Sequence, residues 1–175
     1  MTIYCSKKLE TLLGQISPTV QPTESSILGD WNGHLFTIAK KKCLIFMNNK
    51  TCYSVIMTKV LKKDLKDFGQ VFRERGIRQL DHDLKINERQ EIKVRKEFGD
   101  VTLSKSNNDK KIIGTINHHV DSLKYNNYGG GIENWDDVNV TGILNDYLVG
   151  TKITVDGKRN RGFFRPIELM GELVK

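Results

Sequence analysis

Three polar residues share one face of a predicted helix and have the types needed for acid–base chemistry. Asp121 follows Asn117 by four residues and His118 by three, the spacings that bring helical side chains together. An imidazole beside a carboxylate can act as a general acid–base pair, so His118, Asp121 and Asn117 are candidate catalytic residues of a hydrolase or nuclease. No His, Cys or Glu at metal-ligand spacing accompanies them, so we predict neither a metal nor a cofactor. The alternative is a helix surface with one buried, hydrogen-bonded polar side chain.

A polar segment just before this helix has residues that could bind an anion. The candidate binding residues are Lys105, Asn107, Asn108, Lys110 and Lys111. Backbone N–H groups at a helix N-terminus and nearby ammonium groups both attract phosphate or carboxylate. The alternative is that Asn108 or Asp109 caps the helix while the lysines are solvated.

Cations lie beside aromatic residues in a predicted hairpin around residues 152–164. Lys158, Arg159 and Arg161 precede Phe163 and Phe164. Cations neutralise phosphates and aromatic rings stack on bases, so this combination favours contact with single-stranded nucleic acid. The alternative is a solvated hairpin tip with phenylalanines in the core.

One tryptophan is a further candidate binding residue. Trp31 follows Asp30 at the start of a predicted strand, where an aromatic ring beside a carboxylate could form the floor of a pocket. The alternative is that Trp31 anchors a loop against the core, because large aromatic side chains are buried more often than they are exposed.

Hydrophobic periodicity predicts the elements that position these residues. Strands are predicted where β-prone or alternating residues recur, over residues 3–5, 35–38, 43–47, 52–58, 92–94, 101–103, 152–155 and 162–164. Helices are predicted where apolar residues recur at helical spacing, over residues 7–13, 61–84, 110–125, 142–148 and after Pro166. Gly76 is expected to interrupt the second helix. We predict an α+β fold, with a mostly antiparallel sheet and helices packed on it, as a single domain over residues 1–175 with a flexible loop near 126–134.

Short blocks of sequence carry a resemblance that covers most of the chain in order. They are residues 3–9, 28–31, 42–48, 62–65, 107–117, 144–146 and 165–169. In these blocks the chain resembles a family of small, uncharacterised bacterial proteins that share a conserved domain of unknown function. The resemblance implies an intracellular bacterial or mobile-element setting and no catalytic residue. Lys110 stands where the family usually has an arginine, which keeps the positive charge but not the bidentate fork of a guanidinium.

Composition and charge limit the class of protein. Hydrophobic residues make up 38% and charged residues 28% of the 175 residues, which is ordinary for a globular domain. No apolar run approaches the length of a membrane span, and the first residues lack the apolar stretch of a secretory signal. Cys5, Cys43 and Cys52 form no CxxC pair and are typical of reduced thiols, so we predict a cytoplasmic protein. The net charge of +7 favours a polyanionic partner.

Two classes of function follow from these residues. The first is a small cytoplasmic binding module that contacts nucleic acid or a protein partner through basic surface, using residues 105–111 and 158–161. The second is a hydrolase or nuclease that uses the polar cluster at 117–121. The charge distribution favours the binding module. The hydrolase or nuclease ranks second, because the polar cluster matches no catalytic spacing of known specificity.

Overall fold

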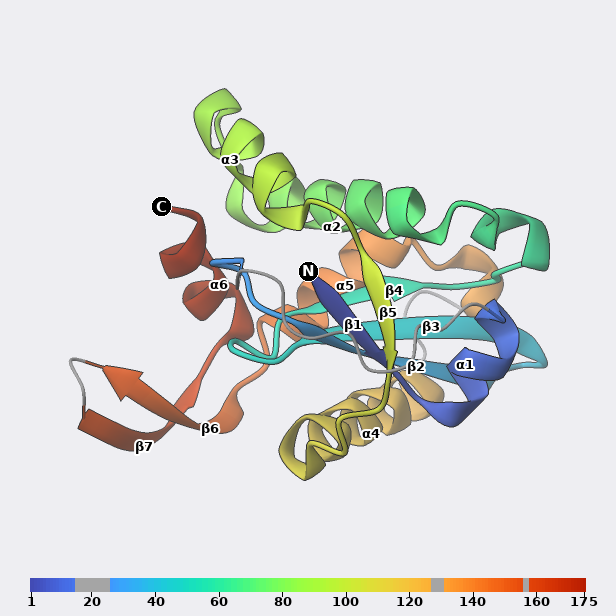
Figure 1. Cartoon of the computed structure of the whole chain (residues 1–175). Coiled ribbons are helices and arrows are strands. Elements are labelled where there is room, and N and C mark those ends of the chain that lie inside the picture. The colour runs from blue at the N-terminus through green and yellow to red at the C-terminus, as the bar shows by residue number, and fades with distance from the viewer. Residues whose placement is uncertain (15–25, 127–130, 156–157) are drawn as a thin grey trace.

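A five-stranded mixed sheet forms the centre of the computed structural model, which describes residues 1–14, 26–126, 131–155 and 158–175 (Figure 1). The side chains of residues 151–161 lie outside the described part. The strands are β1 (Thr2–Cys5), β2 (Trp31–Ile38), β3 (Lys41–Asn48), β4 (Ser54–Met57) and β5 (Thr102–Lys105). Their order in the sheet is β4-β3-β2-β1-β5.

The α+β class is confirmed, but the prediction of a mostly antiparallel sheet is wrong. The meander β2-β3-β4 is antiparallel, whereas β1 pairs in parallel with both β2 and β5. Parallel neighbours need a long crossover connection, and here each connection contains at least one helix. The chain leaves β1 through α1 (Lys7–Leu13), and it reaches β5 through α2 (Phe68–Leu84) and α3 (Glu88–Phe98).

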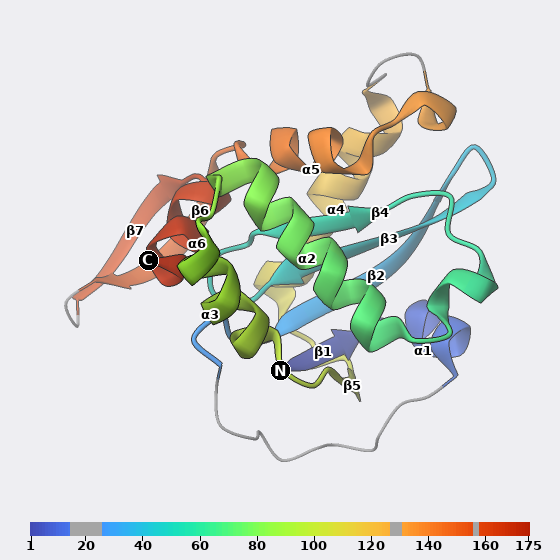
Figure 2. The same ribbon diagram turned by 90° about the horizontal axis from the view of Figure 1, so that it is seen from above.

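Helices cover both faces of the sheet (Figures 1 and 2). On one face lie α2, α3 and α6 (Pro166–Val174), and α1 packs at the end of β1. On the other face lies α4 (Lys110–Tyr125), while α5 (Asp137–Asn145) runs beside β4 and α2. Short 3-10 helices, η1 (Lys62–Leu65) and η2 (Ile132–Asn134), precede α2 and α5. No helix among the described residues combines the length and the apolar character needed to cross a membrane.

Aromatic rings form the centre of the core between the sheet and α2. The Phe72 ring centroid lies 5.0 Å from that of Phe46, 5.3 Å from that of Trp31 and 5.8 Å from that of Phe98. These separations are typical of the edge-to-face contacts that stabilise aromatic clusters. A second apolar core lies between the sheet and α4 and includes Ile45.

Three elements differ from the sequence-based prediction. Residues 88–98 form α3 rather than a strand, because Asn87 and Gln90 make a capping box and Val94 and Phe98 bury one face of the helix. The helix predicted at 142–148 begins earlier, since Asp136 caps α5 at Val138 N–H. The helix predicted over residues 61–84 begins only at Phe68, because residues 62–65 form the separate 3-10 helix η1. Gly76 does not interrupt α2, which is continuous.

The role of Gly76 predicts opposite effects for two glycine-to-alanine substitutions. A Cβ at Gly76 would lie 2.5 Å from Cζ of Phe98, a ring fixed in the aromatic core, so Gly76→Ala is expected to destabilise the fold by about 1–3 kcal/mol. The control is Gly114→Ala in α4, where a Cβ meets nothing within 4 Å. There the better helix propensity of alanine is expected to raise the free energy of unfolding by as much as about 1 kcal/mol. Urea unfolding of both variants measures the sign of each change in stability. Equal changes would contradict the role of Gly76 in packing against Phe98.

A buried polar network joins α2, α5 and the start of β4. The Asp83 carboxylate, whose side chain is 2% exposed, accepts hydrogen bonds from the Tyr53 hydroxyl at 2.6 Å and from the Asn145 and Gln79 amides at 3.0 Å. Asn145 also bonds both backbone groups of Ser54. Burial, together with the negative charge of Asp83, raises the pKa of Tyr53 well above its ordinary value. The network fixes α5 against the sheet edge.

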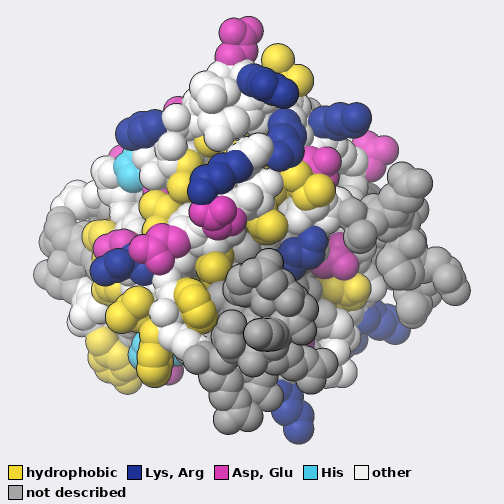
Figure 3. Space-filling model, turned by 90° about the vertical axis from the view of Figure 1, so that its left-hand side faces the viewer, with side chains coloured by type: hydrophobic (Ala, Val, Ile, Leu, Met, Phe, Trp, Pro, Cys, Tyr) yellow, Lys and Arg dark blue, Asp and Glu magenta, His cyan; other side chains and the backbone are white. Residues whose placement is uncertain are grey.

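The end of the molecule that carries α3 and α6 has a surface of mixed charge. Basic and acidic side chains alternate over the described part of this face (Figure 3). Several are paired: Arg95 contacts Glu74 at 3.0 Å, and Arg165 contacts Asp146 at 3.1 Å. The predicted hairpin forms here as β6 (Val149–Val155) and β7 (Lys158–Phe164), which pair antiparallel and project from the body (Figure 1).

Candidate anion-binding site

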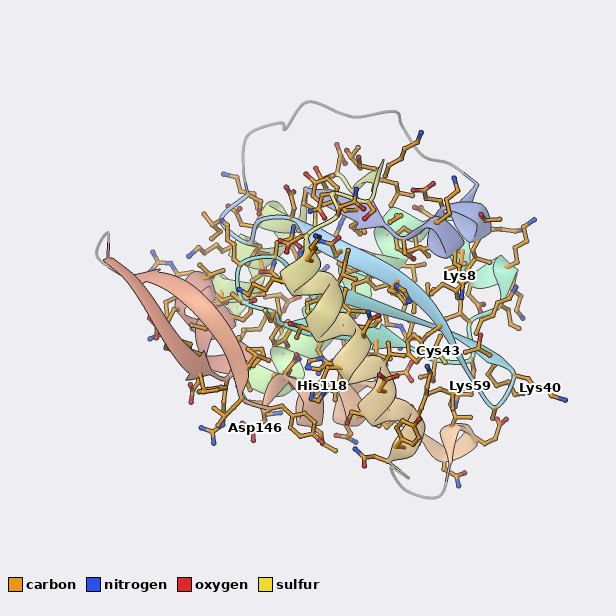
Figure 4. All side chains as sticks on the ribbon, turned by 90° about the horizontal axis from the view of Figure 1, so that it is seen from below. Lys8, Lys40, Cys43, Lys59, His118 and Asp146 are labelled. Carbon is orange, nitrogen blue, oxygen red and sulfur yellow. The ribbon has the colours of Figure 1, made fainter. Side chains whose placement is uncertain are left out.

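Lysines gather at the end of the molecule opposite the β6-β7 hairpin. They come from α1, from the turn between β2 and β3, and from the segment between β4 and α2, three regions that lie together in two views (Figures 1 and 2). Lys8, Lys40 and Lys59 mark this end in Figure 4. The nine residues, called the basic end below, are Lys7, Lys8, Lys40, Lys41, Lys42, Lys59, Lys62, Lys63 and Lys66.

Local backbone structure explains why these lysines project from the body. Ala39 and Lys40 join β2 to β3 as a two-residue turn with φ values of 46° and 63°, the left-handed conformation that matches strand twist in tight hairpins. Lys62, Lys63 and Lys66 lie on and just after η1, where the chain turns from β4 toward α2. Eight of the nine are exposed, and Lys59 is half-buried.

Little of this positive charge is neutralised locally. Among the described residues, the ion pairs of the basic end are Lys7 with Glu10 at 3.4 Å and Lys41 with Glu133 at 3.3 Å. The other acidic residues of the same segments accept backbone N–H groups instead: Asp64 from Leu61, and Asp67 from Gln70. The basic end therefore has an excess of exposed cations, which is the electrostatic requirement for binding a polyanion.

A cleft of about 880 Å³ opens within the basic end, between α1, the start of α2 and β5. Four cations line it: Lys62, Lys63, Lys66 and Arg73. None of the four forms an ion pair with a described residue. Arg73 is half-buried, and its Nε–H is buried without a hydrogen-bond acceptor in the described part of the chain. The guanidinium of Arg73 has no carboxylate partner among the described residues, so it can pair with an anion that enters the cleft.

The cleft combines these cations with apolar side chains and two carboxylates. Leu12 and Leu13 of α1, Val101, and Leu103 of β5 are all half-buried and line it. Asp67 and Asp100 also line it, but Asp67 is engaged as the cap of α2. Four cations against two carboxylates leave the cleft positive, with an apolar part that water alone would solvate poorly.

The predicted catalytic cluster lies on the outer surface of α4. Asn117, His118 and Asp121 are all exposed, and Asp121 pairs with Lys124 at 3.6 Å. Figure 4 labels His118 on this helix. They do not line the described cleft. The neighbouring His119 is 1% exposed, and its Nδ1 lies 3.4 Å from the Ser54 hydroxyl. His119 is therefore a buried polar side chain of the kind that the alternative interpretation expects. Catalysis by the cluster stays a prediction.

The predicted anion-binding segment ends β5 and begins α4. Asp109 caps α4 by accepting the N–H groups of Lys111 and Ile112, as the capping alternative expects. The side chains of Asn107 and Ser106 accept the N–H groups of Asp109 and Asn108. Lys105, Lys110 and Lys111 are exposed. Anion binding by this segment stays a prediction.

The remaining candidate residues have contrasting positions. The side chains of Lys158, Arg159 and Arg161 lie outside the described residues, although their backbone belongs to β7. Phe163, on the same strand, is 76% exposed and therefore not a core residue. Trp31 is completely buried against Phe72 and Phe98, the position expected of an anchor in the core.

Sequence reasoning missed the basic end, although its parts were visible. Lys40-Lys41-Lys42 separates two of the predicted strands, and Lys62, Lys63 and Lys66 fall within the helix predicted over residues 61–84. The usable signal was the recurrence of lysine in three short segments that flank predicted strands. Which of those segments meet in space depends on the sheet order, which the sequence pattern does not contain.

Comparison with known proteins supplies a family. No curated protein and no solved structure matches the chain. One family model matches residues 2–169, nearly the whole chain, and it describes a domain of unknown function. This confirms the resemblance to a conserved domain of unknown function: the chain belongs to the family described as domain of unknown function DUF6933.

Proposed function

We propose that this protein is a small binding module that holds nucleic acid through the basic end. The observation that carries the proposal is the convergence of nine lysines at one end, against three acidic residues, Glu10, Asp64 and Asp67, on the same segments. Lysines spread over three elements can neutralise successive backbone phosphates and release their counterions. Such contacts position a nucleic acid without reading its sequence.

Nucleic acid fits this surface better than a protein partner does. The described ion pairs leave most of the basic end free, and phosphates at regular spacing can engage many separate ammonium groups at once. The interface of a protein partner is centred on buried aromatic and apolar anchors. At the basic end Leu61 is the large apolar side chain that is most exposed, at 56%, and it stands alone among lysines.

A cytoplasmic location belongs to the same proposal. The described cysteines, Cys5, Cys43 and Cys52, are all free and buried, which suits a reducing compartment. Burial raises the pKa of the Cys5 thiol to about 12, so this thiol stays protonated and unreactive at neutral pH.

Charge reversal at the basic end is expected to abolish nucleic-acid binding. Lys40, Lys42 and Lys63 are exposed, so replacing all three with Glu should leave the fold intact. Affinity for a fluorescent single-stranded oligonucleotide at low salt is expected to fall on the order of a hundredfold. The slope of log K against log salt is expected to become shallower by about 2–3. Fluorescence anisotropy measures both quantities.

Two further variants test where binding occurs. The matched control reverses three exposed cations of α2 and α3, Arg78, Arg89 and Lys96, and so changes the net charge equally; only a small loss is expected. Reversal of Lys158, Arg159 and Arg161 tests the predicted hairpin contact. No affinity for any oligonucleotide at low salt would refute the proposal. A loss confined to the hairpin variant would also refute it and would assign binding to the hairpin.

A further inference from the structure

We infer that the cleft in the basic end takes one nucleotide unit of single-stranded nucleic acid, with its phosphate on the cations and its base on the apolar side chains. The inference rests on the proposed function, because the lysines around the cleft would guide the rest of the strand.

The size of the cleft suits a single nucleotide. Its volume of about 880 Å³ lies within the range of sites for small molecules, roughly 300–1,000 Å³. Bases within a duplex are stacked and paired, so a base can enter such a cleft only from a single strand or after extrusion. The cleft therefore favours single-stranded over double-stranded ligands.

The phosphate position is defined by Arg73 and by the lysines on and just after η1. Arg73 lines the cleft and forms no ion pair with a described residue, and its planar guanidinium suits the bidentate binding of a phosphate. Lys63 and Lys66 are exposed at the same cleft and would add charge without fixed geometry. Binding a phosphate there would give Arg73 the anionic partner that it lacks among the described residues.

The base position is defined by aliphatic side chains and two polar groups. Leu13 and Leu103 present half-buried apolar surface that the flat face of a base would cover. Gln70 and Asp100 are exposed at the same cleft. An amide both donates and accepts hydrogen bonds, and a carboxylate accepts from exocyclic amino groups, so these two can contact a base edge. A bare phosphate would use none of these four side chains.

Calorimetric titration with AMP, adenosine and inorganic phosphate tests the inference. AMP is expected to bind saturably and at least tenfold more tightly than adenosine or phosphate, because only AMP meets both halves of the cleft. Arg73→Gln and Lys66→Glu are each expected to weaken AMP at least tenfold. Lys66 is exposed, so the second variant keeps the test valid if the first fails to fold. The matched control, Lys40→Gln with Lys42→Gln, lies outside the cleft and should leave AMP affinity within twofold.

The outcomes separate this inference from the proposed function. Oligonucleotide binding that depends on the basic end, without saturable AMP binding, overturns the cleft site and leaves the proposed function standing. Inorganic phosphate that binds as tightly as AMP also overturns the inference, because the base then contributes nothing. AMP binding without any oligonucleotide binding overturns the proposed function and leaves the cleft as a nucleotide site.

Discussion

Replacing Asp83 with alanine is expected to lower the free energy of unfolding by about 3–5 kcal/mol. The carboxylate is almost completely buried and accepts hydrogen bonds from Tyr53, Gln79 and Asn145. Its removal leaves a buried hydroxyl and two amides short of an acceptor, and each such group costs about 1–3 kcal/mol. His82 also lies 2.8 Å from Asp83, but its ring is partly exposed and can turn to water.

Urea unfolding at neutral pH measures this effect through the transition midpoint, with the slope of the transition as a check on two-state behaviour. The matched control is Asp81→Ala, two residues earlier on α2, where the side chain is exposed and the change should stay within about 0.5 kcal/mol. Tyr53→Phe removes one donor and leaves the carboxylate in place, so its loss should be smaller than that of Asp83→Ala. Equal midpoints for the Asp81 and Asp83 variants would mean that the network contributes nothing to stability.

Local patterns predict most elements of this fold because they depend on short stretches of chain. The stripe that includes Phe68 and Phe72 predicts α2, and Lys7–Leu13 followed by Gly14 predicts α1, whose cap has the left-handed φ of 69°. The strand predicted over residues 92–94 is wrong: Ile92 and Val94 alternate with charged residues as in a strand, but both lie in α3. The capping box of Asn87 and Gln90 was the signal that indicates a helix there.

Long-range pairing is what the sequence could not supply. The parallel register of Ile3 with Leu103 joins segments that are 100 residues apart, and no local feature of either strand encodes it. The same limit applies to the site. Arg73 and Leu12 line one cleft only because α1 and the start of α2 meet beside β5. The network around Asp83 likewise joins side chains at positions 53, 83 and 145, which lie far apart in the sequence.

Acidification is expected to destabilise the protein through His119, which lies on the buried side of α4. Burial, with a smaller contribution from repulsion by His118, lowers the pKa of His119 from 6.5 to about 4. Between these two values the unfolded chain binds a proton that the folded protein does not. The stabilising contribution is therefore complete above about pH 6.5 and is lost as the pH falls toward 4, a total of about 3 kcal/mol.

The test compares the pH dependence of stability in three proteins, because carboxylates contribute to acid unfolding in all of them. His119→Gln keeps a polar side chain near Ser54, but the amide cannot be protonated. Between pH 6.5 and 4 the free energy of unfolding of this variant should therefore fall by about 3 kcal/mol less than that of the wild type. His118→Gln, on the exposed side of α4, removes only the smaller repulsion and should keep most of the wild-type fall. If the His119→Gln curve ran parallel to wild type, the buried imidazole would not be the group that links protonation to unfolding. A parallel His118→Gln curve with a flattened His119→Gln curve would assign that linkage to burial rather than to the histidine pair.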